Sequence, residues 1–430
     1  MRKPKYISGP INTIRLEGSV NGIKKILYVM MDYHRDLDKQ TECENIFATN
    51  IKQLMVQSFL RTNNGDKKYD IFLEMYPAWL TKIKRYVLED KQFYGENMVL
   101  TEKYIWSLEN LFSRLIGHSP ESDKISSPKE FPNIRLHYID IREYSWNNIN
   151  SNLGLVMESI NGLNNDITNY KLVLIRDTIL LVGSQLRSAY DLIFSNTSGK
   201  KPIKLFPTVP KSLEDFSKYT PADFIDKARE IFYKMTNRYK HEAVREPILK
   251  ILNTTIKDHY ETMFREIDLL LTTLDEYLKF DFDRMNIPFL FNPSSDVPKE
   301  RLVDYAYGIP WDIKKDIVDR IQKMTMYVYQ FYLNIGVLQV DIFFLRRFLD
   351  KDYITNAAVY AGAAHGSNYV FNLVKHFDFK ITHASYSKHP IDKMNSLIKD
   401  MESFEYLQQY LFPPVLYQCS NLTDFPPFLE

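Results

Sequence analysis

Two carboxylates and two histidines have residue types and positions that suit hydrolytic or metal chemistry. Each follows a short apolar run of the chain: Asp32, His34, Glu74 and His365. Neutral imidazole serves as a metal ligand or as a general base near pH 7, and two carboxylates would complete a set for Mn²⁺ or Zn²⁺. A metal lowers the pKa of its bound water to about 7, whereas a histidine paired with a carboxylate activates water directly. The four residues therefore predict a hydrolytic site, with or without a divalent metal ion.

Further polar residues near these positions could bind substrate. Asp140 and Arg142 follow another apolar run, and Asp341 and Arg346 lie in an apolar helical stretch. An arginine can hold an anionic group or stabilise an oxyanion. Gly362, followed by two alanines, would leave room for a ligand above the end of a strand.

Each of these residues also has a purely structural interpretation. His34 can cap a helix, Glu74 can pair with an arginine, and Asp140 can form an ion pair with Arg142. Asp341 can be satisfied by a buried partner instead of belonging to a site. A histidine between small residues, as at His365, is the hardest of the set to explain in this way.

The elements that would position these residues are read from hydrophobic periodicity. Short apolar runs predict strands at 24–31, 69–73, 134–139 and 356–361, and patterns near a 3.6-residue period predict helices over 37–59 and 78–118. A further strand is expected at 377–383 and a last helix at 390–411. Strands separated by helices, each followed by an acid or a histidine, predict a mostly parallel α/β sheet flanked by helices. Ligands bind at the carboxyl ends of such strands.

The middle of the chain lacks strand patterns. Amphipathic stretches at 170–194, 221–239 and 247–277 predict a large all-helical insertion, and helices over 311–326 and 327–349 lead back to the sheet. We therefore expect three segments: an α/β core (1–150), a helical insertion with a connector (151–310) and the rest of the core (311–430). The runs ending at His34 and His365 resemble one another, which suggests two half-sites facing each other.

Composition excludes several functional classes. Among 430 residues, 55 basic and 54 acidic side chains leave a net charge of +1, so no global field favours nucleic acid or an anionic membrane. Nor is there a Walker phosphate loop, a Gly-x-Ser-x-Gly elbow or zinc-finger spacing. The two cysteines, Cys43 and Cys419, are too few and too distant in sequence for a disulfide framework, and Cys43 lies in a helical pattern. A reducing compartment is expected.

The start of the chain has no apolar stretch of a signal peptide, so an intracellular location is predicted. Residues 326–345 are apolar enough to raise the question of a membrane span. Gln330, Asn334 and Asp341 would form one polar stripe on this helix, which favours burial in protein over a transmembrane segment. The expected partners are a small-molecule or peptide substrate and, as an open alternative, other proteins.

The motifs resemble those of the superfamily that groups erythromycin esterases, ChaN-like haem-uptake lipoproteins and the TIKI/TraB/PrgY proteins. Asp32-Tyr33-His34 is similar to its first motif, Phe72-Leu73-Glu74 to its second and Gly362-Ala363-Ala364-His365 to its last. The resemblance covers roughly residues 20–145 and 325–385. It implies an α/β fold and an esterase-like or metalloprotease-like hydrolase acting on an ester or peptide-like bond.

Two features qualify what this resemblance implies. Members with an esterase-like or ChaN-like first motif carry Gly-Glu before the histidine, whereas this chain has Met31-Asp32. Residues 341–365 and 139–142 also resemble uncharacterised proteins of large DNA viruses. Two other functions stay open: a non-catalytic virion or host-interaction protein, and haem or metal binding without turnover.

Overall fold

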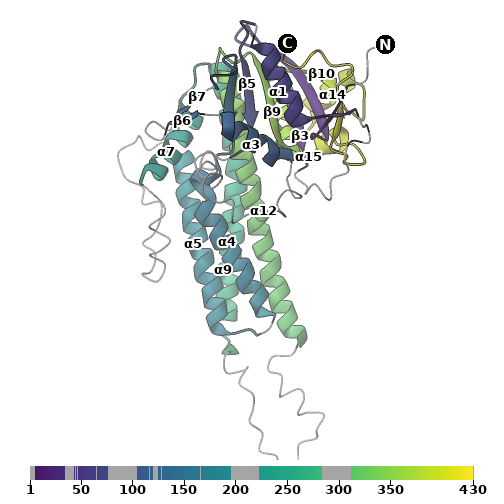
Figure 1. Cartoon of the computed structure of the whole chain (residues 1–430). Coiled ribbons are helices and arrows are strands. Elements are labelled where there is room, and N and C mark those ends of the chain that lie inside the picture. The colour runs from purple at the N-terminus through teal and green to yellow at the C-terminus, as the bar shows by residue number, and fades with distance from the viewer. Residues whose placement is uncertain are drawn as a thin grey trace, which may run out of the picture. The chain divides into compact units, whose positions relative to one another are not determined.

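The computed structural model describes residues 5–33, 43, 45, 47–63, 65–75, 104–115, 117–119, 124–126, 128–164, 166–194, 222–282 and 311–429. They divide into two compact units (Figure 1). The first comprises Met1–Glu143, Arg238–Leu249 and Leu338–Glu430, and the second comprises Tyr144–Asn237 and Lys250–Val337. These bounds differ from the sequence-based division at 150 and 310, because one long helix begins in the second unit and ends in the first.

A six-stranded sheet forms the centre of the first unit. Its strand order is β10-β2-β3-β9-β5-β8. The strands, in that order, are Lys380–Ala384, Asn12–Val20, Ile23–Asp32, Asn356–Gly362, Tyr69–Leu73 and Ile134–Tyr138. Neighbours from β3 to β8 are parallel, whereas β2 runs antiparallel to both β3 and β10. The predicted α/β class and mostly parallel sheet are confirmed; strand β2 was not predicted.

Strand β9 lies between two strands that come some 300 residues earlier in the chain. It pairs in parallel with β3 on one side and with β5 on the other. Gly362 lies opposite Asp32, and Tyr360 lies opposite Leu73. Almost all of β9 is buried, as expected for a central parallel strand. The late glycine and histidine motif is therefore brought to the strand ends that carry the early motifs.

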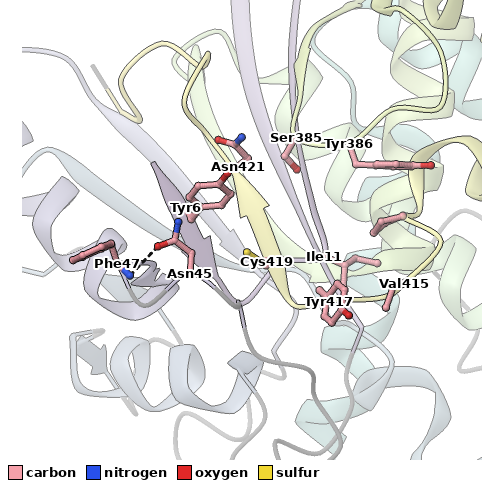
Figure 2. A pocket seen from close by; sticks show the side chains of 11 residues that line it. Tyr6, Ile11, Asn45, Phe47, Ser385, Tyr386, Val415, Tyr417, Cys419 and Asn421 are labelled. Atoms are coloured by element: carbon pink, nitrogen blue, oxygen red, sulfur yellow. Dashed lines mark hydrogen bonds between the residues drawn. The ribbon is translucent and has the colours of Figure 1, made fainter. Parts of the chain in front are cut away.

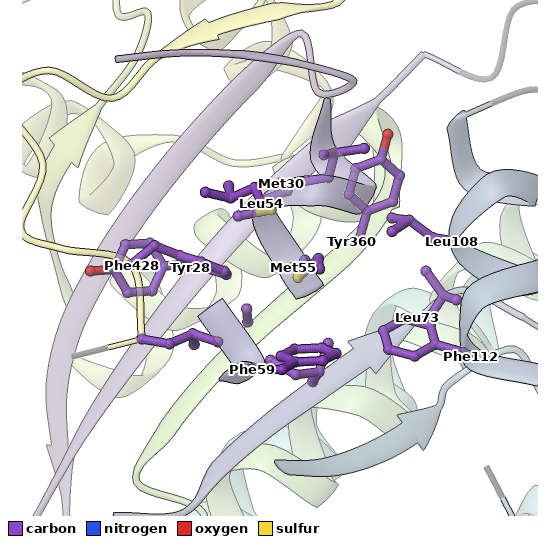
Figure 3. Close-up of a cluster of buried hydrophobic side chains, with 14 of the residues drawn as sticks. Tyr28, Met30, Leu54, Met55, Phe59, Leu73, Leu108, Phe112, Tyr360 and Phe428 are labelled. Atoms are coloured by element: carbon purple, nitrogen blue, oxygen red, sulfur yellow. The ribbon is translucent and has the colours of Figure 1, made fainter. Parts of the chain in front are cut away.

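Helices cover the two faces of the sheet. On one face, Tyr28, Met30 and Tyr360 join a hydrophobic cluster with α1 (Ile51–Thr62) and α3 (Tyr104–Leu115) (Figure 3). On the other face lie α13 (Ala363–Phe377) and the end of α12 (Trp311–Asp350). There Phe344 contacts Phe72, with ring centroids 5.0 Å apart.

Gly366 permits α13 to pack closely on β3. A Cβ atom at this position would lie 2.6 Å from Cγ of Met31. The glycine that follows His365 is thus required by helix packing, and its presence is no evidence for a ligand.

The two ends of the chain meet in a second, three-stranded sheet. Its order is β11-β1-β4, formed by Cys419–Asn421, Tyr6–Ser8 and Thr49–Asn50. Cys43 and Cys419 form a disulfide here, with their Cα atoms 4.8 Å apart. The expectation that the two cysteines are too distant in sequence to form a disulfide was wrong, because the fold brings together residues that are 376 positions apart. Cys43 itself lies outside any helix, contrary to the helix predicted over 37–59, and with the disulfide the argument for a reducing compartment loses its basis.

The remaining elements of the first unit are short. They are the hairpin strands β6 (Gly117–Ser119) and β7 (Lys124–Ser126), helix α8 (Glu242–Ile251), of which the last two residues fall in the second unit, and helices α14 (Ile391–Asp400) and α15 (Glu405–Leu411).

The described part of the second unit is helical, as predicted. It contains most of α4 (Glu143–Leu163), then α5 (Asn169–Phe194), α7 (Ala222–Asn237), the π-helical turn η4 (Leu252–Ile256), α9 (Lys257–Tyr277) and the first part of α12. The long helices α4, α5 and α9 run alongside one another (Figure 1). Tyr190 of α5 packs on Tyr260 of α9, with ring centroids 5.6 Å apart.

Helix α12 was expected as two helices and is one. Within the described residues, its segment Ile313–Asp350 is long and apolar enough to cross a membrane. However, 67% of its most apolar window is buried inside the protein. Core helices pass the same test, so length and composition are weak evidence for a span here.

A buried lysine closes the carboxyl end of α12. Lys25 is 1% exposed, and its ammonium group donates to the carbonyl oxygens of Phe348, Lys351 and Ile354 at 3.1, 2.8 and 2.6 Å. The last carbonyls of a helix have no partner within the helix, and a cation there also interacts favourably with the helix dipole. Burial lowers the pKa of Lys25 to about 8, against the attraction of nearby aspartates.

Replacing this lysine should destabilise the first unit. We expect Lys25→Met to lower the free energy of unfolding by about 1–3 kcal/mol, because buried carbonyl oxygens lose their donor. Lys24→Met is the matched control, since the side chain of Lys24 is 70% exposed. Equal effects of the two changes in urea denaturation would show that Lys25 does not cap α12.

The disulfide should stabilise the fold by constraining the unfolded chain. We expect the double change Cys43→Ser and Cys419→Ser to lower the free energy of unfolding by about 2–4 kcal/mol. Reductant should have a similar effect on the native chain and none on the double variant. Thermal denaturation with and without reductant measures this. A native chain that is insensitive to reductant would contradict the pairing.

Candidate functional site

The carboxylate of Glu74 lies at the meeting point of several strand ends. Strand β5 ends at Leu73, and the next residue points to the face of the sheet that carries Phe72, since side chains alternate along a strand. Oε2 of Glu74 accepts a hydrogen bond of 2.7 Å from the backbone N–H of Gly362, where α13 begins. A carboxylate is well placed there, because helix N-termini carry unsatisfied N–H groups and a partial positive charge.

His365 lies between two carboxylates. Its Nε2 is 3.2 Å from Oε1 of Glu74, and its Nδ1 is 2.6 Å from Oδ1 of Asp341. Asp341 comes from α12, and its second oxygen accepts from the amide nitrogen of Asn368 at 2.5 Å. The three ionisable residues are buried, with exposed fractions of 8% or less. Asp341 thus fixes the ring of His365 so that Nε2 faces Glu74.

Arg142 connects this pair to the end of β8. Its guanidinium makes a two-pronged ion pair with Asp140, with bonds of 2.9 and 2.5 Å, and Nη2 also donates to Oε1 of Glu74 at 3.0 Å. The side chain of Arg142 is 29% exposed, and Ala364 beside His365 is exposed too. The network therefore reaches solvent through Arg142.

The two carboxylates determine the charge of His365. Burial alone would lower its pKa, but attraction by Glu74 and Asp341 raises the pKa of His365 to about 10. Burial raises the pKa of the Asp341 carboxyl, against the lowering effect of its bonds from His365 and Asn368. The imidazole of His365 is thus held as imidazolium at neutral pH. In that state Nε2 can donate a proton.

Asp32 belongs to the opposite face of the sheet. Asp32 comes two residues after Met30, so both side chains lie on the face of the sheet that α1 covers. Its Oδ1 accepts a hydrogen bond of 2.8 Å from Gln418. It raises the pKa of the buried Tyr360 hydroxyl on that face, together with burial itself. The proposed grouping of Asp32 with Glu74 and His365 is therefore not seen, because the alternation of the strand turns Asp32 away from them. His34 lies outside the described residues.

The structure therefore does not bring together Asp32, Glu74 and His365, the three predicted metal ligands that it describes. No cluster of three or more histidine, cysteine, aspartate or glutamate side chains with metal-binding geometry occurs in that part of the chain. Of the three predicted metal ligands that the structure describes, only Glu74 and His365 lie together.

The remaining predicted substrate residues divide into two groups. Asp140, Asp341 and Gly362 all join the Glu74–His365 network, but as hydrogen-bond partners of its members. Arg346 does not join it: its Nε and Nη2 donate to the backbone oxygen of Arg238, and its guanidinium stacks over Tyr239. Arg346 comes five residues after Asp341 on α12, which turns the two side chains about 140° apart, so they contact different neighbours.

A second buried histidine network was not predicted from the sequence. Nε2 of His137 lies 2.7 Å from Asp70, while Arg347 donates to Nδ1 at 3.0 Å and Arg135 makes a two-pronged ion pair with Asp70. Burial, aided by the nearby arginines, lowers the pKa of His137 to about 4. Asn368 was also missed, although its position one helical turn after His365 could have indicated it.

Stability should depend on the charge of His365. The folded pKa of about 10 exceeds the unfolded value of 6.5, so the stabilisation is fully present below pH 6.5 and is lost as pH rises through 10. Between these values the free energy of unfolding should fall by up to about 1.4 kcal/mol per pH unit from this group. Urea denaturation of the native chain and of His365→Gln measures the difference. Parallel pH profiles of the two proteins would contradict the assignment.

Comparison with known proteins gives matches along the whole chain. Residues 5–430 match one family model, described as a family of unknown function (DUF5847). Uncharacterized protein R706 of Acanthamoeba polyphaga mimivirus is 30% identical, over 98% of this chain and 96% of that protein. Uncharacterized protein R161 of the same virus is 32% identical, over 98% and 97%. No solved structure matches the chain.

These matches confirm the likeness to proteins of large DNA viruses. They do not show membership of the superfamily of erythromycin esterases, ChaN-like proteins and TIKI/TraB/PrgY proteins. The family model covers almost every residue of the sequence, including the helical region between the two parts of the sheet. The chain therefore belongs to the DUF5847 family.

Proposed function

We propose that this protein is a hydrolase of an ester or peptide-like bond, with Glu74 and His365 as its catalytic pair. The observation that carries the proposal is the Asp341–His365–Glu74 chain of contacts at the carboxyl ends of adjacent parallel strands. Open parallel sheets bind their ligands at this edge. An acid that orients a histidine, which in turn faces a second acid–base group, is an arrangement that proton-transfer catalysis uses.

The geometry suggests a role for each group. Glu74 takes a proton from a water molecule as the water oxygen attacks the carbonyl carbon. His365 donates its Nε2 proton to the departing oxygen or nitrogen, so that one water is consumed and an acid and an alcohol or amine are released. Asp341 holds the imidazolium in position and stabilises its charge, and Arg142 aligns the Glu74 carboxylate.

The charges of the network favour an uncharged acyl group as substrate. Three carboxylates, Glu74, Asp140 and Asp341, face the two cations Arg142 and His365. Both prongs of Arg142 are already engaged by Asp140. An anionic substrate would therefore have to displace a carboxylate, whereas a neutral ester or amide would not.

A hydrolysis screen with matched variants tests this proposal. The native chain should hydrolyse some member of a panel of neutral p-nitrophenyl esters and fluorogenic peptides. Glu74→Gln and His365→Gln should each lower the rate by roughly 10²–10⁴-fold, because each removes a proton-transfer group. His137→Gln is the control, since it changes another buried histidine on the same sheet face.

The outcomes of the screen separate the possibilities. Equal loss in all three variants would indicate misfolding and not catalysis, so circular dichroism accompanies each assay. Running the assays with a chelator and with added Mn²⁺ or Zn²⁺ tests whether turnover needs a metal ion. If Glu74→Gln and His365→Gln both turn over substrate at the native rate, Glu74 and His365 are not the catalytic pair.

A second candidate is a non-catalytic interaction protein of the virion or of the infected host. One observation favours it: both nitrogens of His365 have carboxylate neighbours, and its ring is only 4% exposed. Such a network can serve solely to fasten strand ends. Under this function no substrate of the panel is turned over, while Glu74→Gln and His365→Gln still lower stability.

A further inference from the structure

A cleft of about 730 Å³ lies where the two ends of the chain come together (Figure 2). Segments that are remote in sequence form its walls: strands β1 and β11, residues 45 and 47, residues 385–386, and residues 413, 415 and 417. Small-molecule sites typically have volumes of roughly 300–1,000 Å³. The cleft shares no residue with the Glu74–His365 network, so it is independent of the function proposed above.

Hydrogen bonds fix one wall of the cleft in place. The fully buried side chain of Asn12 accepts from the backbone N–H of Tyr386 at 3.0 Å, and its amide donates to the oxygens of Tyr386 and Leu411 at 3.0 and 2.7 Å. Ser385 donates to the same asparagine at 2.7 Å. A cleft whose wall is held by buried polar contacts loses little conformational entropy when it binds a ligand.

The opposite wall is held by strand pairing and by the disulfide. Tyr6 of β1 lies opposite Asn421 of β11 in register. Cys419 of the same strand is bonded to Cys43, two residues before Asn45. The disulfide therefore tethers the wall that carries Asn45 and Phe47.

The chemistry of the lining is aromatic and uncharged. None of its described residues carries a charge, and aromatic rings come from Tyr6, Phe47, Tyr386 and Tyr417. Phe47 is 84% exposed, which is unusual for a phenylalanine that has no partner to cover it. Such a lining offers stacking surfaces and no counter-charge for an ionic ligand.

Two side-chain amides supply directional hydrogen bonds. The oxygen of Asn45 accepts from the N–H of Phe47 at 2.9 Å, and that of Asn421 accepts from Thr423. Within the described part of the chain, the amide nitrogens of both residues donate to no protein acceptor. They can therefore donate to the edge of a ligand that carries acceptor atoms.

We propose that this cleft binds an uncharged, planar heteroaromatic small molecule, stacked on the tyrosine and phenylalanine rings and hydrogen bonded at its edge by Asn45 and Asn421. An anionic ligand is disfavoured because none of the described lining residues is a cation. A purely aliphatic ligand would leave the two amides without acceptors, which costs binding free energy.

Ligand-observed NMR with defined probes tests the proposal. Adenosine, whose base is uncharged, planar and carries acceptor nitrogens at its edge, should show saturable binding to the full chain. Indole, which is planar but carries only a donor N–H, should bind more weakly than adenosine. Cyclohexanol, which is not aromatic, and adenosine monophosphate, which is anionic, should bind at least tenfold more weakly than adenosine.

Phe47→Ala should weaken adenosine binding by about tenfold, since one stacking contact is worth about 1–3 kcal/mol. Because Phe47 is exposed, its removal should not impair folding.

Control variants make the result decisive. Tyr406→Ala removes another aromatic ring, 57% exposed and outside the cleft, and should leave adenosine binding unchanged. The double change of Cys43 and Cys419 to serine should weaken binding, because it frees the tethered wall. The proposal is overturned if adenosine shows no saturable binding, if cyclohexanol or the monophosphate binds as well as adenosine, or if Phe47→Ala binds like the native chain.

Discussion

The carboxylate of Glu74 contacts groups that belong to separate parts of the chain, through two hydrogen bonds and one ion pair. Gly362, whose backbone N–H contacts Glu74, is the N-cap of α13, and His365 lies one turn later in that helix. Arg142 comes from the segment after β8. The ends of β5, β9 and β8 are thus fastened at one point. Parallel strands cannot be joined by tight turns, and this network adds side-chain contacts between their ends.

The charge of a buried histidine in this protein depends on the charged groups beside its ring. His365 and His137 are both buried histidines that contact a carboxylate on the same face of the sheet, but their pKa values are shifted in opposite directions. His365 has two carboxylates beside its ring. The single carboxylate beside His137 is already paired with Arg135, and Arg347 donates to its other nitrogen. The imidazolium near the strand ends is therefore a product of its surroundings and not of burial alone.

Much of this arrangement could be predicted from the sequence. Continuous apolar runs predicted the parallel strands, and the polar residues directly after these runs predicted that Glu74 and His365 lie near one another. Asp32 was misplaced because adjacent strand positions face opposite sides, and a motif at a strand end does not reveal which side is used. Strand β2 carries the alternation of Ile14 and Leu16 with Arg15 and Glu17, a signal that could have been recognised. The Cys43–Cys419 pairing could not, since it depends on which strands pair.

The protonation of His365 is the property on which the account depends most directly. It can be measured by recording the ring carbon and nitrogen shifts of labelled histidine across pH 5–10, with His365→Gln to assign the resonance. We predict that the ring stays protonated through pH 8, with both nitrogens bearing hydrogen. A ring that titrates near 6.5, the ordinary value, would contradict the arrangement of Asp341, His365 and Glu74 described above.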